Sequence, residues 1–565
     1  MAPDGLLRRS LLSVSPRALA SWTLGLTVLA LAATYLARMP CCTRMGHPIF
    51  LRLFAFDDFN AAAVTAALCV LTLALAPLRR AGTWLADCCA LHPGRVLVVA
   101  LVGLSALVPL AYLDHALSMD EYAPRLQAHA FASGTIGAAW PPQLLDRIIS
   151  PGFQGYFFFT HPATGLATSA YWPGLALLMT PLARFNAEGL LNPALAVLSL
   201  ALIYSIASTL AGDRRAGGWA LLLTLASPAF TVNAISFYAM NGLLTLDLLF
   251  AWLLMRGGLG SSALAGLAGG LALVLHNPVP HALFALPWLL WLLADRSRWP
   301  RLAAVAAGYL PFGIGIGAGW PLLMQHLGLD PLVASPDPQG FAAGWLHRLQ
   351  GIFQLPGEEL LTARFHATWK LWIWAAPGLL VLAALGLRRS IGQPWTRLLV
   401  ASLACTYAFY FLVSFDQGHG WGYRYLQSAW GVLPILGGMV LASPPAGDPE
   451  RQWRETAGAL ALAGLLVTPL FLWQVHRNVA ESLAWRTPVP PTGYWLDFVD
   501  LRQGYYVGDV VQNLPGMTRV LTLISQGEDS DAALAAQYFP SARHIRSDRR
   551  GSLWQLSAPP LPLQR

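Results

Sequence analysis

The stretch ALASWTLGLTVLALAATYLA (residues 18–37) decides the fold class. An α-helix needs about 20 predominantly apolar residues to cross the hydrocarbon core of a bilayer, and this run supplies them. Arg8, Arg9 and Arg17 precede the run, which is too long for a signal-peptide core and lacks a convincing small-residue cleavage site. We therefore expect it to remain as the first membrane helix, with the N-terminus in the cytoplasm.

The composition of the whole chain indicates the same class. Of 565 residues, 56% are hydrophobic, only 11% are charged and 22 are Trp, which exceeds what a soluble domain carries. The net charge of +8 does not indicate a nucleic-acid partner, because the Arg residues are scattered in short clusters between apolar runs. The six Cys residues fit neither a disulfide framework nor a structural zinc site. We expect a polytopic membrane protein, and we assign no metal ligands.

Apolar runs of roughly 17 to 22 residues recur along the chain, and we interpret thirteen of them as membrane-spanning helices. Their approximate ranges are 18–37, 60–77, 96–113, 190–211, 217–234, 238–255, 261–275, 281–294, 302–324, 369–387, 397–415, 424–442 and 456–474. Most Arg clusters then fall in cytoplasmic loops, as the positive-inside rule requires, although the loop 38–59 breaks the trend. The arrangement places the C-terminus on the extracytoplasmic side of a cell (inner) membrane.

Three segments outside these runs have features of their own. Two are large outer loops, 114–189 and 325–368, and the first contains a short apolar stretch, 171–182, that we interpret as an interfacial helix. The second carries Glu358 and Glu359 and could form a lid or a second wall of a site. Residues 477–565 are less apolar, and alternation over 518–524 predicts a strand in a small extracytoplasmic α/β tail.

The acidic pair Asp120 and Glu121 is the best clue to chemistry in this chain. It stands in the first outer loop, directly after an apolar helix. Ionisable groups beside a bilayer are costly to desolvate, so they persist most easily where they meet water, a cation or a reacting group. A solvated helix cap is the other interpretation, because Asp and Glu also favour helix N-termini.

Other polar and aromatic residues are expected at the same membrane surface. In the segment Asp416–Tyr425, glycines allow close approach of a ligand and Arg424 could grip a phosphate; the alternative is an interfacial turn with an Arg anchor. His276 and His281 are separated by prolines, which weakens a zinc site. One of them, or Asn277, could contact a phosphate. The intramembrane Asp247 is either structural or part of a transport route.

In their order along the chain, these features resemble the GT-C superfamily of membrane glycosyltransferases. The likeness is to the protein O-mannosyltransferase and aminoarabinose-transferase branch, which uses polyprenyl-phosphate sugars, and it covers about Ala18 to His476. Members carry an acidic pair in the first large outer loop and then an aromatic Pro-Gly segment, matched here by Asp120–Glu121 and Tyr171–Gly174. A Gly-Trp-Gly-x-Arg-Tyr element before a late helix is matched by Gly420–Tyr425.

The resemblance implies an all-α polytopic fold with its site on the outer face. It implies that Asp120 is the catalytic base, with Glu121 as the alternative, and that Arg424 contacts the donor phosphate. The candidate substrate-binding residues are Tyr171, His276, Asn277, His281, Trp421, Arg424 and Tyr425. Many relatives have a Lys beside their Pro-rich segments, where this chain has His276–Pro278 and Ser169–Tyr171. The donor and the phosphate-binding residue therefore stay open.

The function that follows is transfer of a hexosyl or pentosyl group, with inversion, from a polyprenyl-phosphate sugar to a hydroxyl or amine. The acceptor could be a lipid, a protein or a polysaccharide, and an acidic pair could hold a divalent cation without requiring one. Two other classes stay open. One is a transporter or flippase for a lipid-linked or small polar solute, with Asp247 and the His residues as a proton route. The other is a noncatalytic subunit of an envelope-polysaccharide assembly.

Overall fold

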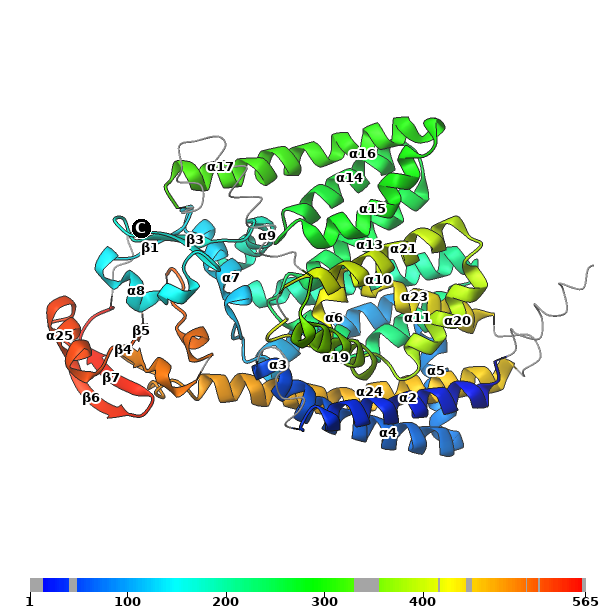
Figure 1. Ribbon diagram of the computed structural model, residues 1–565, viewed down its shortest axis with the longest axis horizontal. Helices are drawn as coiled ribbons and strands as arrows, with labels where there is room; N and C mark the ends of the chain where they lie inside the picture. The colour runs from blue at the N-terminus through cyan, green and yellow to red at the C-terminus, as the bar shows by residue number, and fades with distance from the viewer. Residues whose placement is uncertain are drawn as a thin grey trace, which may run out of the picture.

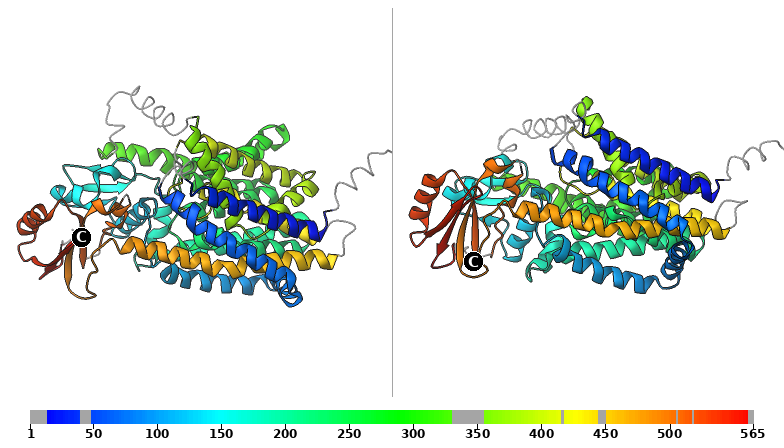
Figure 2. Two further views of the ribbon diagram at one scale, coloured as in Figure 1. Left: turned by 60° about the horizontal axis from the view of Figure 1, so that its bottom comes forward. Right: turned by 90° about the horizontal axis from the view of Figure 1, so that it is seen from below.

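The computed structural model describes residues 14–39, 48–329, 355–414, 417–443, 450–504, 506–516 and 519–560. A large bundle of helices makes up most of the molecule, and a smaller body of strands and short helices lies at one end of it (Figure 1). The smaller body combines the first outer loop with the end of the chain. Helix α24 (Glu450–Leu483) runs along the bundle and leads into that body (Figure 2). The boundary expected at residue 476 lies inside this helix.

Within the described residues, seven helical segments are long and apolar enough to cross a membrane. They are Pro16–Leu36 (α2), Ile49–Ala74 (from α3, Pro48–Arg52, to α4, Phe59–Ala74), Pro93–Ala111 (α6), Glu188–Ala211 (ending in α10, Leu191–Ala211), Arg296–His326 (with α16, Trp299–Phe312, and α17, Gly319–His326), Pro394–Leu412 (beginning with α21, Pro394–Phe409) and Glu450–Leu483 (α24). Up to ten qualify if three bent pairs each count as one span. The chain is therefore built as a membrane protein, and the expected number of thirteen spans is not confirmed.

Among the described residues, helices nevertheless make up most of every expected range, and helix length and bends explain the lower count. Three of the expected spans correspond to helices α13 (Met240–Arg256), α14 (Leu259–Leu273) and α15 (Val279–Leu293), which have only 17, 15 and 15 residues. A straight helix of 15 residues reaches about 23 Å, which is less than the roughly 30 Å of a bilayer core.

Breaks in the bent pairs have identifiable causes in the sequence. Helices α19 (Glu358–Trp374) and α20 (Leu379–Ser390) meet at 94°, and α11 (Arg214–Leu225) and α12 (Pro228–Ile235) meet at 67°. Pro377 lies in the first break and Pro228 directly after the second, and Pro cannot continue the helical hydrogen-bond ladder. The freed backbone is satisfied across the breaks, because the Ala376 N–H donates to the Ser227 hydroxyl at 2.8 Å.

The described residues cover only part of the second expected outer loop, 325–368. Residues 330–354, which include His347 and Arg348, lie outside the described residues. Glu358, Glu359 and His366 lie on α19. The expected role of this segment as a lid or wall stays a prediction.

One helix of the bundle was not expected from the sequence. Helix α5 (Ala76–Leu91) carries Arg79 and Arg80 and occupies what the hydropathy indicated as a loop. It packs against α24, where a Cβ atom added to Gly82 would lie 2.0 Å from the Gly458 carbonyl oxygen. Small residues at such crossings let two backbones approach, and this contact holds the two helices together.

The first outer loop is folded throughout. It contains α7 (Met119–Ala132), a three-stranded antiparallel sheet and α9 (Gly174–Ala183), which is the short apolar helix expected over 171–182. The strands are β1 (Ala138–Ala139), β2 (Phe158–His161) and β3 (Leu166–Ser169), in the order β1-β3-β2. Helix α9 packs on α7, so the loop forms a fixed platform beside the bundle.

The predicted α/β tail is confirmed. Its sheet has the order β5-β4-β7-β6, with bounds Tyr494–Val499 (β4), Val520–Ile524 (β5), Arg543–Asp548 (β6) and Gly551–Leu556 (β7). Strand β5 covers the alternating stretch, pairs in parallel with β4, and is followed by α25 (Glu528–Tyr538). We call residues 494–556 the strand domain.

The strand domain and the first outer loop share one hydrophobic core. Leu496, Phe498 and Leu523 belong to the same buried cluster as Leu144 and Phe158. Arg147 of the loop also donates to the Ile524 carbonyl at 2.8 Å and to the Asp531 carboxylate at 2.9 Å. The end of the chain is therefore docked on the loop that carries the acidic pair.

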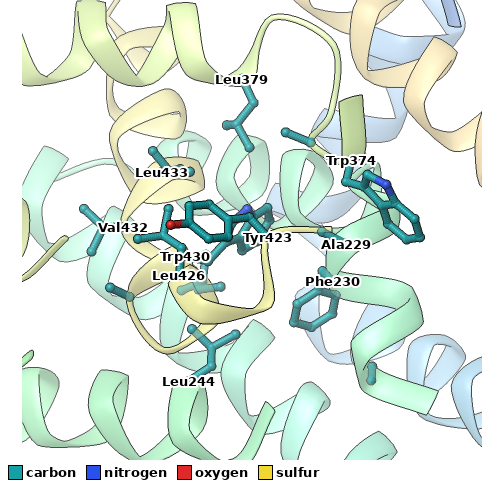
Figure 3. Packing of buried hydrophobic residues seen from close by; sticks show 14 of the residues in the cluster. Ala229, Phe230, Leu244, Trp374, Leu379, Tyr423, Leu426, Trp430, Val432 and Leu433 are labelled. Carbon is teal, nitrogen blue, oxygen red and sulfur yellow. The ribbon is translucent and has the colours of Figure 1, made fainter. Parts of the chain in front are cut away.

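The core of the bundle contains the residues on both sides of Arg424 in the sequence. Tyr423, Leu426 and Trp430 are packed among Phe230, Leu244, Trp374 and Leu433 in Figure 3. Gly422 has φ +66°, and a Cβ atom there would lie 3.2 Å from the Ala229 Cβ. Because Gly adopts this backbone conformation without strain, the turn fits between the helices and fixes where Arg424 begins its short helix.

We predict that Gly82→Ala lowers the stability of the protein. An added methyl forces α5 and α24 apart, and overpacking of this kind costs about 1–3 kcal/mol. Gly103→Ala is the matched control, since nothing lies within 4 Å of a Cβ atom at Gly103 in α6. The control is expected to be neutral or slightly stabilising. Thermal unfolding in detergent measures both, and a Gly82→Ala midpoint at or above that of the wild type would contradict the packing described.

Candidate active site

Asp120 and Glu121 lie in the first turn of α7, directly after Ser118, which is extended. A helix N-terminus is a favourable place for negative charge. Neither residue is a solvated cap, however, because Glu121 is fully buried and the Asp120 side chain is only 22% exposed. Because both carboxyls are largely buried, the solvated helix cap, which the sequence left open, is the less favoured interpretation. A site enclosed by the fold is favoured instead.

Asp120 is the point where three distant parts of the chain meet. Arg424, at the start of the 3₁₀ helix η9 (Arg424–Leu426), donates from Nη1 to Asp120 Oδ2 at 2.9 Å. The Tyr171 hydroxyl donates to Asp120 Oδ1. The juxtaposition expected from the sequence is thus present in the structure. An ion pair with an additional hydrogen bond is how a buried carboxylate is stabilised.

The electrostatics of Asp120 favour its ionised form. Burial raises the pKa of its carboxyl, but the charge of Arg424 and the hydrogen bonds of Tyr171 and Arg424 outweigh burial. The pKa therefore lies below its ordinary value. At neutral pH Asp120 is a carboxylate, the form that can accept a proton.

Glu121 has a different environment from its neighbour. Its carboxyl accepts hydrogen bonds from the Tyr112 hydroxyl at 2.8 Å and from the backbone N–H groups of Leu117 and Phe237 at 2.8 and 2.9 Å. Burial outweighs these donors and raises the pKa of Glu121 to about 7. With both oxygens engaged and no exposed surface, Glu121 holds the loop to the α12–α13 turn rather than facing a substrate.

Arg424 is buried, and it lies among aromatic rings. Its guanidinium carbon lies 4.9 Å from the Tyr238 ring centroid and 5.7 Å from that of Tyr425. Its Nε is buried without a hydrogen-bond partner. A Cβ atom at Gly420 would lie 2.7 Å from the Arg424 Cδ, so glycine there leaves room for the side chain. One donor of Arg424 is therefore left for a ligand.

His276 is held against the site by backbone pairing. Trp172 and Gly174 donate from their N–H groups to the carbonyls of His276 and Val274 at 3.2 and 2.9 Å. The ring centroids of Tyr171 and His276 then lie 3.8 Å apart. The His276 Nδ1 is buried without a hydrogen-bond partner, and burial lowers the pKa of this imidazole to about 4. His276 is thus a neutral group at neutral pH, beside Asp120 and Arg424.

His281 and Asn277 do not join this group. His281, on α15, is fully buried; its Nδ1 lies 2.5 Å from the Asp247 Oδ1 and its Nε2 lies 2.6 Å from the Tyr309 hydroxyl. The Asn277 side chain accepts the Val279 N–H at 3.2 Å and so starts α15. Between the two His residues, His276 is the one that faces the candidate site.

Trp421 and Tyr425 are buried on either side of Arg424. Trp421 donates from Nε1 to the Tyr112 hydroxyl at 3.1 Å, and Tyr425 stacks on Tyr410 with ring centroids 4.7 Å apart. Asp416, at the start of the same motif, lies outside the described residues. Trp421 therefore contacts Tyr112, the partner of Glu121, whereas the ring of Tyr425 lies beside the Arg424 guanidinium.

Sequence reasoning missed two neighbours of the acidic pair. The Tyr238 hydroxyl is hydrogen-bonded to the Ser118 hydroxyl at 3.0 Å; the aromatic pair Phe237–Tyr238, at the start of the expected span 238–255, was the available signal. Asp509 comes from the strand domain and lies near both carboxyls of the pair. No pattern near Asp509 indicated that contact. Among the described residues, no group of three or more His, Cys, Asp or Glu side chains could hold a metal ion.

Comparisons with known proteins identify the fold. No family model matches the chain, and no curated protein matches it. The crystal structure of ArnT from Cupriavidus metallidurans bound to undecaprenyl phosphate is similar, at 14% identity and TM-score 0.50, over 82% of this chain and 98% of that one. The apo structure of the same protein matches at 13% identity and TM-score 0.49 over the same shares. ArnT is an aminoarabinose transferase of the GT-C type, so this chain has a GT-C fold.

We predict energetic coupling between Asp120 and Arg424. Arg424→Gln leaves the Asp120 carboxylate without its cation and should destabilise the fold by about 3 kcal/mol, the lower end for buried pairs. Adding Asp120→Asn should recover about 1–2 kcal/mol of that loss, since the unpaired charge is then removed. Chemical unfolding in detergent of the two single variants and the double variant measures the coupling. Strictly additive losses would show that the two groups do not face each other.

Proposed function

We propose that this chain, built on a GT-C fold, is an integral membrane glycosyltransferase. It moves a sugar from a polyprenyl-phosphate donor to a hydroxyl or amine of an acceptor on the extracytoplasmic face of the membrane. The observation that carries the proposal is the group formed by the Asp120 carboxylate, the Arg424 guanidinium at 2.9 Å and the neutral His276. A base and a phosphate-binding cation are what transfer from a sugar phosphate needs.

The donor phosphate is assigned to Arg424 and His276. The guanidinium has an unpartnered Nε and a planar fork suited to a phosphate, and His276, whose Nδ1 is also unpartnered, is close enough to interact with its charge. When the phosphate binds, Arg424 interacts with the phosphate as well as with Asp120. The Asp120 carboxylate then has fewer contacts and is available to the acceptor. These two residues stand in for the Lys that the sequence lacks beside its Pro-rich segments.

The transfer is a single displacement at the anomeric carbon. The acceptor oxygen or nitrogen forms the new glycosidic bond while its proton passes to the Asp120 carboxylate. The bond between the anomeric carbon and the phosphate oxygen breaks, and polyprenyl phosphate leaves with the electron pair, stabilised by Arg424. Attack opposite the leaving group inverts the configuration. The group transferred is a hexosyl or pentosyl unit.

The location of the residues supports a lipid-linked donor. The site lies where the helical bundle meets the first outer loop and the strand domain (Figure 1). A prenyl chain lies between helices in the bilayer while its sugar phosphate reaches this end. The similar crystal structure contains undecaprenyl phosphate, which supports the same class of donor here. The Arg distribution supports an extracytoplasmic site with the N-terminus in the cytoplasm. The acceptor is a lipid, a protein or a polysaccharide.

The alternative of a proton-coupled transporter finds less support. It relied on Asp247 and the His residues as a route for protons. Both ring nitrogens of His281 are within hydrogen-bond distance of a partner, one of Asp247 and the other of Tyr309. Asp247 lies in the interior of the bundle with no exposed surface. This arrangement suits a structural hydrogen-bond network between α13, α15 and α16.

We predict that Asp120→Asn abolishes transfer by protein that still folds, although loss of the anionic partner of Arg424 lowers its stability. The amide keeps the size of the side chain but cannot act as the base, so turnover should fall by about 10²- to 10⁴-fold. Asp146→Asn, an exposed position in the same loop, is the control and should retain activity. The measurement is transfer of labelled sugar from a panel of polyprenyl-phosphate sugars by the reconstituted protein. Turnover of Asp120→Asn at the level of the control would reject Asp120 as the base.

We also predict the direction in which Arg424→Gln changes the pH profile. Without the guanidinium, burial of Asp120 is opposed by fewer favourable interactions, so the pKa of Asp120 rises. Protonated Asp120 cannot accept a proton, and the acidic limb of turnover should move up by about 1–3 pH units. Tyr171→Phe removes only a hydroxyl donor and should move the limb less, in the same direction. An unmoved acidic limb in Arg424→Gln would contradict the electrostatic role of this residue.

A further inference from the structure

Strained backbone lies directly before the helix that carries the acidic pair. Three non-glycine residues of the described chain have a positive φ. Two of them are neighbours in the turn between α6 and α7, Leu113 at 54° and Asp114 at 49°, and the third, Asn186 at 51°, lies just before the 3₁₀ helix η5 (Glu188–Leu190). Residues other than glycine are disfavoured in this left-handed region, so such turns persist only where their surroundings hold them.

Arg125 joins these two places. It lies on α7 and is 6% exposed. Its Nη1 donates to the Asp114 carbonyl at 2.9 Å, and its Nη2 donates to the Asp114 carboxylate at 3.3 Å. Its Nε donates to the carboxylate of the buried Glu188 at 2.7 Å, and the His129 Nε2, one turn further along α7, lies 3.0 Å from the same oxygen. One guanidinium therefore connects α7 to the strained turn before it and to η5.

Arg125 shares a face of α7 with Glu121, which lies four residues earlier. Glu121 accepts the Tyr112 hydroxyl and the Leu117 N–H, at the two ends of the turn. The Arg125 guanidinium carbon also lies 4.6 Å from the ring centroid of Phe237, whose N–H donates to Glu121. The two side chains together attach this face of α7 to the turn and to the bundle.

This attachment fixes the rotation of α7 about its axis. Successive residues of an α-helix point about 100° apart, because one turn contains 3.6 residues. When the face with Glu121 and Arg125 is held, the direction of Asp120 is therefore set as well. In that direction the Asp120 carboxylate meets the Arg424 guanidinium at 2.9 Å.

We propose that Arg125 is a positioning residue for the transfer reaction: by holding the strained turn and Glu188, it fixes the rotation of α7 and so the direction of the Asp120 carboxylate. This inference rests on the proposed function, in which Asp120 is the base. A base must be held close to its reacting geometry, because a misplacement of about 1 Å can reduce turnover by about 10²-fold. The planar guanidinium, with donors in several fixed directions, is what allows one side chain to serve both partners.

Arg147 supplies a matched control. It is also 6% exposed, and it also donates to a carboxylate and to a backbone carbonyl, those of Asp531 and Ile524. These contacts dock the strand domain on the first outer loop, and the shared hydrophobic core keeps the domain docked when they weaken. Replacing either arginine by lysine keeps the charge but removes the planar fork. Only the change at Arg125 loosens the attachment of α7 to the strained turn.

The experiment compares Arg125→Lys, Arg147→Lys and the double variant Asp114→Gly/Arg125→Lys in the reconstituted full-length protein, with labelled polyprenyl-phosphate sugar as donor. Unfolding midpoints are measured first, so that turnover is expressed per folded molecule. We expect kcat of Arg125→Lys to fall by about 10- to 100-fold, with KM for the donor little changed. Arg147→Lys should lower the midpoint but keep kcat.

The double variant tests the contribution of the strained backbone. Glycine adopts a left-handed conformation without strain, so the turn at position 114 then keeps its shape without the guanidinium. We expect Asp114→Gly to restore most of the kcat that Arg125→Lys loses. If Arg125 contributed only to stability, Arg125→Lys would show no loss of kcat per folded molecule.

Three results would overturn the inference. They are wild-type kcat in folded Arg125→Lys, an equal loss of kcat in Arg125→Lys and Arg147→Lys, and no recovery of kcat when Asp114→Gly is added. If Arg125→Lys does not fold, Glu188→Gln decides. Its neutral amide keeps the size of the side chain but weakens the bond to the Arg125 Nε, so kcat should fall. Wild-type kcat in Glu188→Gln would contradict the inference.

A readout without turnover separates this inference from the proposed function. Hydrogen exchange at the amides of residues 117–122 should be faster in Arg125→Lys than in Arg147→Lys, because only the former loosens the start of α7. If wild-type protein transfers no sugar while this difference is present, the proposed function fails and the attachment of α7 stands. If transfer depends on Asp120 but the amides exchange equally in both variants, the inference about Arg125 fails alone.

Discussion

The ion pair between Asp120 and Arg424 is the constraint on which the site depends. Two charges taken out of water must satisfy each other, because an unpartnered buried charge costs several kcal/mol. The pair joins positions 304 residues apart, so it can form only if the first outer loop and the late turn Gly420–Tyr425 meet at the same end of the bundle. The rest of the local structure can be understood as what brings these two groups together.

Each partner is held by a different kind of structure. Arg424 follows a glycine-rich turn packed among aromatic side chains in the interior of the bundle, and this packing fixes its backbone (Figure 3). Asp120 is on the first turn of α7, which is held by Glu121 through the Phe237 N–H and by the strand domain through Ala116 and Tyr122. Glu121 therefore helps to fix the location of Asp120, the residue that we propose as the base. A carboxyl that is used structurally and one that is available for chemistry stand side by side, and their hydrogen-bond partners distinguish them.

Apolar runs in the sequence predict much of the fold, but they predict less of the candidate site. The predominantly apolar run of α2 and the alternating residues of β5 reveal their structure directly, because period and length are local properties. Helix α5 was missed because its Arg residues interrupt the hydropathy, and the bends at Pro228 and Pro377 shorten spans that length alone predicts. Asp120, Tyr171 and Arg424 could be grouped from their order in the topology. The sequence left His276 and His281 equivalent, and it gave no sign of Asp509, because these distinctions depend on tertiary contacts.

The central claim is that Asp120 and Arg424 share one site for a lipid-linked sugar phosphate. The most direct test is a cryo-electron-microscopy structure of the full-length protein in nanodiscs with an added polyprenyl phosphate. The account predicts the phosphate within hydrogen-bond distance of the Arg424 guanidinium, with the prenyl chain between the helices and Asp120 facing the space beside the phosphate. A phosphate bound at the other end of the bundle, away from both residues, would contradict it.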